Sequence, residues 1–200
     1  MKLMRLALPP IFALVLALPA AAQAISLDAL SAYLNSLKSV ATDFTQINAD
    51  GSRSTGKLYI ARPGRARFEY APPDQTLVLA SGGQVAIFDD KSNTMAEQYP
   101  LRSTPLNLVL AANIDLGAAR MVVGHGSDAN VTWVEAQDPE HPEYGSITLL
   151  FTPAPTTLRQ WIIRDQGGNQ TAVLLGDLMP REDLSAFLFS ITAEVNARKD

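Results

Sequence analysis

The 200-residue sequence has no cysteine and only two histidines, His125 and His141. The absence of cysteine excludes a disulfide framework, and it also excludes a lipid-modified N-terminal cysteine. The sequence also lacks a glycine-rich phosphate loop, a nucleophile elbow and a zinc-protease helix. These absences favour a binding protein over an enzyme.

The two histidines lie in polar loops, and these loops give only weak support for a catalytic or a metal site. His125, Ser127 and Asp128 are near neighbours in one loop, whereas a catalytic triad requires side chains that converge from a fixed scaffold. A secreted hydrolase using this loop is therefore the less favoured hypothesis. A second loop contains four candidate metal ligands, Asp138, Glu140, His141 and Glu143. Without a companion cluster they indicate a solvated acidic loop, and we expect no catalytic residue, metal or cofactor.

The N-terminal residues have the pattern of a secretory signal peptide. Lys2 and Arg5 precede an apolar segment, 6–18, and the small residues Ala22-Gln23-Ala24 follow it. The apolar segment contains two prolines, and it is shorter than a membrane-spanning helix, which needs about 20 residues. We therefore predict a signal peptide over residues 1–24, cleavage near Ala24 and a mature protein outside the cytoplasm.

The composition of the remainder predicts one globular domain over residues 25–200. Hydrophobic residues make up 47 % of the sequence and charged residues 18 %, which is typical of a folded chain. Loss of Lys2 and Arg5 would leave 14 basic residues against 20 acidic ones, a formal charge of −6. An acidic surface argues against nucleic acid as a partner.

Two helices are predicted, and both must cover apolar surface. Ser26 can cap a helix whose apolar face is formed by Leu27, Leu30, Leu34 and Leu37. A short apolar helix is predicted over Leu106–Ala112, with Thr104 as its N-cap and Pro105 at its first position. We call this second segment the lid helix.

Most of the remaining sequence has the short alternating runs and turn residues of an antiparallel sheet. About ten or eleven strands are expected, from these candidates: Val40–Ile47, Thr55–Arg62, Arg65–Ala71, Thr76–Ala80, Gln84–Phe88, Thr94–Tyr99, Arg120–Gly124, Asn130–Ala136, Ser146–Thr152, Thr157–Arg164, Gln170–Leu175 and Phe187–Ile191. Met179–Leu184 is interpreted as a turn or short helix, and Ala193–Asp200 as a polar tail. The fold class is mainly β (α+β), because a sheet of this size tends to curl and both helices are available to cover its open face.

The hairpin around Pro63-Gly64 contains one unusual charge. Arg62 has the same alternation phase as Leu58 and Ile60, so it lies on or beside the apolar face. A charge in that position is costly unless it finds a partner.

The ordered set of these motifs resembles the periplasmic outer-membrane lipoprotein carrier family, LolA, over essentially the whole mature chain. The segments that support the resemblance are Asp43–Gln46, Gly56–Ile60, Arg62–Tyr70, Leu77–Val85 with its Gly82-Gly83 turn, and Ser103–Leu106. The resemblance implies a half-open, curved antiparallel β-barrel covered by the N-terminal helix and the lid helix, which together enclose an apolar cavity.

The resemblance also implies a function and two residue roles. A monomeric carrier would receive acylated lipoproteins from an inner-membrane ABC transporter and deliver them to an outer-membrane receptor. Arg62 matches the family's arginine that hydrogen-bonds to the lid and holds it shut. The family has a bulky apolar residue where this chain has Ala66, so the two differ there. A carrier or sensor of another amphiphile, such as a glycolipid or fatty acid, is the alternative with the same fold.

Strand phase gives the candidate ligand-binding residues. Those expected to face the cavity are Leu58, Ile60, Ala66, Phe68, Tyr70, Leu77, Leu79, Val85 and Ile87. Those expected to form the lid and its latch are Arg62, Leu106, Val109 and Leu110.

Overall fold

The computed structural model describes residues 23–89, 96–118, 120–128 and 130–198. Residues 1–22, which hold most of the expected signal peptide, lie outside this part of the chain, as does the start of the predicted Thr94–Tyr99 strand. Within the described ranges, no helix is both long enough and apolar enough to cross a membrane.

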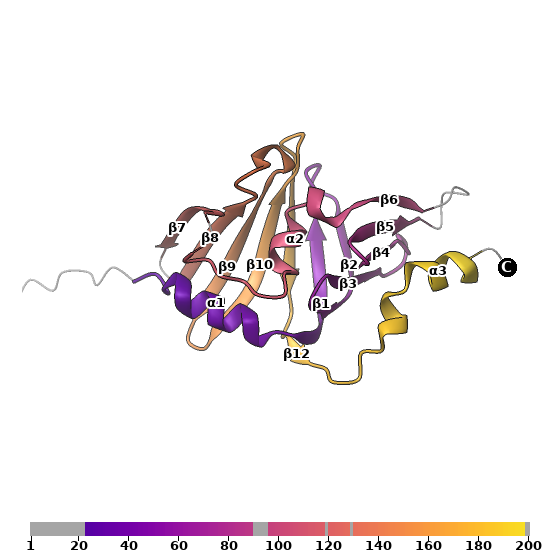
Figure 1. The fold of residues 1–200 in the computed structure, drawn as a ribbon, viewed down its shortest axis with the longest axis horizontal. Helices are drawn as coiled ribbons and strands as arrows, with labels where there is room; N and C mark the ends of the chain where they lie inside the picture. The colour runs from indigo at the N-terminus through magenta and orange to yellow at the C-terminus, as the bar shows by residue number, and fades with distance from the viewer. Residues whose placement is uncertain (1–22, 90–95, 119, 129, 199–200) are drawn as a thin grey trace, which may run out of the picture.

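Over the described residues the chain forms a twelve-stranded antiparallel sheet, which confirms the predicted architecture (Figure 1). The strand count exceeds the expected ten or eleven, because Met179 and Pro180, interpreted from the sequence as part of a turn or short helix, pair with Ala41 and Val40. Its strands are β1 Ser39–Ile47, β2 Arg53–Ala61, β3 Arg65–Tyr70, β4 Leu77–Ser81, β5 Gln84–Phe88, β6 Glu97–Pro100, β7 Val122–Asp128, β8 Val131–Gln137, β9 Ser146–Pro153, β10 Thr156–Arg164, β11 Gln170–Leu175 and β12 Met179–Pro180. The strand order is β6-β5-β4-β3-β2-β1-β11-β10-β9-β8-β7, with β12 paired to β1. Strands β6 and β7 end this path without pairing to each other, so the sheet is open.

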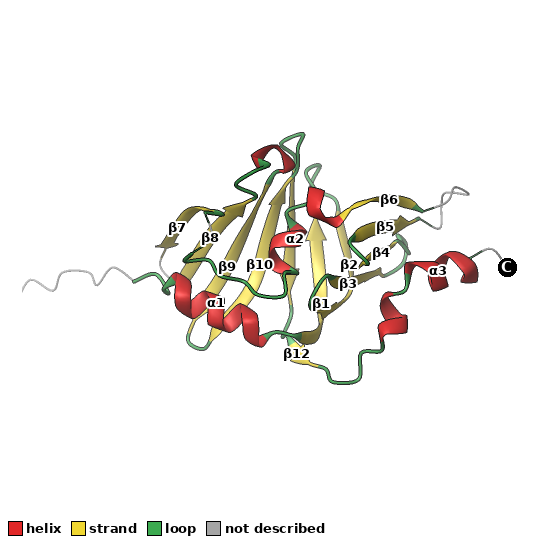
Figure 2. Cartoon of the chain, in the orientation of Figure 1, coloured by secondary structure: helices red, strands yellow, loops and turns green. Residues whose placement is uncertain are grey.

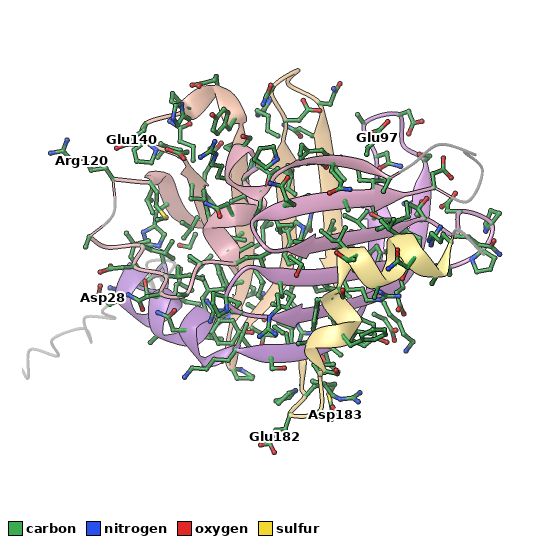
Figure 3. The ribbon with its side chains drawn as sticks, turned by 45° about the vertical axis from the view of Figure 1, so that its right-hand side comes forward. Asp28, Glu97, Arg120, Glu140, Glu182 and Asp183 are labelled. Carbon is green, nitrogen blue, oxygen red and sulfur yellow. The ribbon has the colours of Figure 1, made fainter. Side chains whose placement is uncertain are left out.

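Short helices cover both faces of the sheet (Figure 2). The helical segments are α1 Leu27–Ser36, η1 Leu101–Ser103, α2 Leu106–Val109, η2 Pro142–Tyr144, η3 Ala186–Phe189 and α3 Ile191–Ala197. We call the face that carries α1 and α2 the inner face. The outer face of β3–β5 carries η3 and α3. Charged side chains such as Asp28, Glu140 and Asp183 project from the periphery (Figure 3).

The main hydrophobic core lies between the inner face and the helices α1 and α2. Leu30 and Leu34 of α1 pack with Leu106 and Leu110 and with inner-face residues such as Phe151. Ser26 caps α1 as predicted, because its side chain accepts a hydrogen bond from the backbone N–H of Ala29. The one-sided leucine pattern of α1 is therefore explained by burial against the sheet.

A second, smaller core occupies the outer face of β4 and β5. Leu77, Leu79, Ala86 and Phe88 are buried there, with Ile191 and Val195 of α3 packed against them. Here the sequence prediction is wrong, because Phe187–Ile191 and Ala193–Asp200 were expected to be a strand and a polar tail. Ser190 instead caps α3 by accepting a hydrogen bond from the backbone N–H of Ala193.

Two further local predictions are corrected. Thr104 does not cap α2, because its hydroxyl donates to the carbonyl of Leu101 and Pro105 occupies the cap position. The residues from Gly124 to Asp128 form most of strand β7 and not a loop. The ring of Trp133 on β8 lies close to both Gly124 and Gly126. A Cβ atom added to Gly124 would lie 2.8 Å from this ring, and one added to Gly126 would lie 3.0 Å from it. These glycines are therefore needed for strand packing.

Candidate functional site: an apolar cavity under a helical cover

A cavity of about 490 Å³ lies between the inner face of the sheet and the segment that leads into α2. Its volume falls within the roughly 300–1,000 Å³ typical of pockets for small ligands. Its apolar lining residues are Phe68, Val78, Val85, Pro105, Leu106, Trp161, Ile163 and Val173. Its polar lining comprises Gln46, Tyr70, Tyr99, Ser103, Thr104, Tyr144, Asp165, Gln166, Gly167 and Thr171.

The structure places the expected cavity, lid and latch residues in five groups, the last of which, Leu77 and Leu79, lies on the outer face. Phe68, Tyr70, Val85 and Leu106 line the cavity. Ile60, Arg62 and Val109 line a smaller space of about 30 Å³. Leu58, Ala66 and Leu110 are buried in the same core. Ile87 pairs with Val78 and so shares its face, but it lines neither space.

The prediction that Leu77 and Leu79 face the cavity is wrong. Leu79 pairs with Arg67, whereas the cavity residue Phe68 pairs with Val78. Partners in an antiparallel pair point to the same face, so Val78 faces the cavity and its two neighbours face outward. Both outward leucines are buried by the second core.

One indole borders both spaces. Trp161 on β10 lines both the cavity and the smaller space, and it is almost fully buried. Its ring makes an edge contact with the ring of Phe68, with centroids 6.4 Å apart. The smaller space continues toward Leu34, Leu37 and Arg62. Sequence reasoning did not select Trp161, because its strand is remote in sequence from the hairpin around Pro63.

Arg62 forms hydrogen bonds to backbone carbonyls from both helical regions. Its Nε donates to Leu37 O at 3.1 Å, its Nη2 donates to Leu34 O, and its Nη1 donates to Ala111 O at 3.4 Å. Burial of the guanidinium lowers the pKa of Arg62 from its ordinary value, yet arginine stays protonated in proteins. The carbonyls at the C-terminus of α1 have negative partial charge and therefore stabilise this cation.

The same two helical regions are joined by polar side chains of α1. Asn35 Nδ2 donates to Ile114 O at 2.8 Å, and Asn35 Oδ1 accepts from Ile114 N at 3.0 Å. The hydroxyl of Ser31 accepts from Leu116 N at 2.9 Å. Together with Arg62 these bonds make α1 and residues 101–116 one connected unit, which we call the cover. Sequence reasoning missed Asn35 and Ser31, since no periodicity identifies their backbone partners.

The cavity wall on β1–β3 is built from aromatic rings. Phe44 makes edge contacts with both Phe68 and Tyr70, with ring centroids 5.6 and 5.1 Å apart. The Tyr70 hydroxyl donates to Gln46 Oε1 at 2.6 Å. Burial raises the pKa of Tyr70 to about 12, so this phenol is neutral at physiological pH.

The polar lining residues come from loops and strand ends at one end of the sheet. Tyr99, Tyr144 and Asp165 belong to β6, η2 and the β10–β11 turn. These elements lie at the upper end in Figure 1, whereas β12 and the C-terminal end of α1 lie at the lower end. We call the polar lining residues Gln46, Tyr99, Ser103, Thr104, Tyr144, Asp165, Gln166 and Thr171 the mouth. The mouth and the Arg62 bonds are therefore at opposite ends.

Among the described residues, the geometry around the two histidines supports neither the hydrolase hypothesis nor a metal site. His125 Nε2 lies 2.9 Å from Ile25 O and so connects β7 to the chain before α1. His141 stacks on Tyr144 at 4.7 Å between ring centroids and contacts Glu143 Oε1 at 3.0 Å. Within the described ranges, no group of three or more His, Cys, Asp or Glu side chains could hold a metal ion.

An open curved sheet, an apolar cavity and a hydrogen-bonded helical cover are the architecture of a protein that binds apolar or amphipathic ligands. The family model described as outer membrane lipoprotein carrier protein LolA matches residues 35–192. The chain belongs to this family.

Individual relatives are similar in sequence over most of the chain. The outer-membrane lipoprotein carrier protein of Methylococcus capsulatus is 27% identical over 181 residues, covering 86% of each chain. That of Chromobacterium violaceum is 28% identical over 164 residues, covering 78% of each chain. Among solved structures, a DUF1329 family protein from Desulfovibrio piger has a TM-score of 0.50 and 11% identity, covering 84% of this chain and 96% of that one. This last likeness concerns the fold alone.

Proposed function

We propose that this protein carries acylated lipoproteins through the periplasm, from an inner-membrane ABC transporter to an outer-membrane receptor. During transport, an acyl chain of the lipoprotein is held in the cavity. The observation that supports this most is the apolar cavity, one wall of which is residues 103–106 of a cover that hydrogen bonds and side-chain packing hold in place. The family to which the chain belongs supports the same cargo.

The energetics fit reversible carriage. Exposing an acyl chain to water costs about 0.8 kcal/mol per methylene, so one long chain requires on the order of 10 kcal/mol of shielding. A hydrogen bond from a charged group contributes about 1.5–3 kcal/mol. The bonds of Arg62 and Asn35 can therefore close the cover without making its opening prohibitive.

The residue that follows the expected cleavage site is bound to the sheet. The backbone N–H of Ile25, directly after Ala24, donates to Thr132 Oγ1 at 3.1 Å. We propose that the signal peptide ends at Ala24 and that the mature protein works in the periplasm.

The test is release of lipoproteins from spheroplasts of a Gram-negative bacterium. Purified mature protein should transfer lipoproteins into the soluble fraction, where they co-purify with it. Ile163→Trp should abolish release, because Ile163 lines the cavity and a larger side chain fills it. Ile162→Trp is the matched control, since the adjacent residue has the opposite strand phase. Recovery of only glycolipid or fatty acid with the wild-type protein would overturn the proposed cargo.

A further inference from the structure

The mouth of the cavity has one charge, and that charge is negative. Among the lining residues that the structure describes, none is lysine or arginine, and Asp165 alone is ionised at neutral pH. The remaining mouth residues are uncharged amides, hydroxyls and phenols. An anion that enters this mouth therefore meets a carboxylate and no lining cation.

Asp165 is held in this position by the β10–β11 turn. Its carboxylate accepts hydrogen bonds from Asn169 N at 2.9 Å and from Asn169 Nδ2 at 3.1 Å. These bonds lower the pKa of Asp165 below its ordinary value, so it stays ionised in any physiological medium. Trp161 and Ile163, four and two residues earlier on β10, line the same cavity, whereas Arg164 does not. Asp165 begins the turn after β10, and it lines the cavity together with the next two turn residues, Gln166 and Gly167.

We propose that Asp165 and the otherwise uncharged mouth select acyl groups whose head is an uncharged ester or amide, and disfavour anionic phospholipids. This inference rests on the proposed function, because it concerns which acylated molecule enters the same cavity. The hydroxyls of Ser103, Thr104 and Tyr144 can donate to ester and amide carbonyls. A phosphate would lie near Asp165 without a lysine or arginine to balance it.

The selection would separate lipoproteins from the bulk lipid of the membrane from which they are extracted. Both molecules carry long acyl chains, so the apolar wall formed by Phe68, Trp161 and Val173 cannot tell them apart. Discrimination must come from the head, and electrostatic repulsion of the unwanted head is a general route to it. The same repulsion disfavours free fatty acids, which are carboxylates.

The experiment compares two lipids that differ only in the head, dioctanoylglycerol and dioctanoyl phosphatidylglycerol. Each displaces the uncharged dye N-phenyl-1-naphthylamine from the mature protein at low salt. The wild type should bind the uncharged lipid more tightly. Asp165→Asn, which keeps an acceptor for the turn, should strengthen phosphatidylglycerol binding about threefold to tenfold and should change dioctanoylglycerol binding less. High salt should reduce the difference.

Two further variants make the result specific. Gln166→Lys places a cation in the mouth beside Asp165 and should also favour phosphatidylglycerol. Asp50→Asn is the matched control, because Asp50 has the same turn-stabilising role, accepting from Ser52 N at 2.9 Å, but does not line the cavity. An unchanged lipid preference in Asp165→Asn, or an equal change in Asp50→Asn, would overturn the inference. If neither lipid displaced the dye although the dye itself bound, the proposed function would fail instead.

Discussion

The side chain of Asn35 and the backbone of Ile114 exchange two hydrogen bonds, one from Nδ2 to the carbonyl at 2.8 Å and one from the backbone N–H to Oδ1 at 3.0 Å. Asn35→Leu removes both and leaves two partly buried backbone groups unpaired. We expect it to lower the free energy of unfolding by about 1–3 kcal/mol, measured by urea denaturation. Ser36→Ala, which removes one exposed bond to Tyr33 O, should change it by less than about 0.5 kcal/mol. Equal effects of the two would refute the role of Asn35.

Arg62→Leu should loosen the cover. The substitution removes all three bonds to the carbonyls of Leu34, Leu37 and Ala111. We expect faster hydrogen exchange in both α1 and residues 106–111, together with slower or incomplete transfer of cargo. Arg65→Leu removes the same charge from a side chain that instead contacts Ala61 O and Phe189, so exchange in the cover should be unaffected. Unchanged exchange and transfer in Arg62→Leu would show that Arg62 does not hold the cover.

The C-terminal segment offers a matched pair of phenylalanines. Phe189 is 0% exposed and Phe187 is 75% exposed. Phe189→Ala should lower the free energy of unfolding by about 3–5 kcal/mol because it empties a packed site, whereas Phe187→Ala should stay within about 0.5 kcal/mol. Denaturant melts of the two variants test this, and a small effect of Phe189→Ala would mean that η3 is not firmly docked.

Alkaline pH should destabilise the protein through Tyr70. Its pKa is raised to about 12 by burial, whereas an unfolded chain has a tyrosine pKa of about 10. The stabilisation from the neutral phenol is therefore complete below about pH 10 and is lost as the pH rises toward 12, by about 2–3 kcal/mol in total. Urea denaturation between pH 9 and 12 measures the loss, and Tyr70→Phe should flatten it. An unaltered slope in Tyr70→Phe would assign the loss to other groups.

Most of the sheet follows from local sequence pattern. Strands β5 and β11 have the bounds that alternation and the flanking glycine turns predict. Ser26 begins α1 as expected, and Arg62 lies beside the inner face as its phase with Ile60 requires. In α1 and β11 one side of the element is covered and the other is more exposed, which is the condition under which periodicity is informative. Strand β5 is covered on both faces, and its start is set instead by the Gly82-Gly83 turn.

The failures occur where both faces are covered or where distant strands meet. Leu77-Val78-Leu79 is apolar throughout because α3 buries its outer face, so alternation cannot give its phase. The one available signal for α3 was Ser190 followed by Ile191 and Val195, which are one helical turn apart. The mouth could not be predicted, because Gln46, Tyr99 and Asp165 converge only after strands far apart in the sequence pair.

The position of Trp161 bears on the proposed carriage of acyl chains. The indole is almost fully buried and lines both the cavity and the smaller space beside Arg62. An acyl chain carried in the cavity would therefore pack against the same side chain that borders the space at the Arg62 end of the molecule.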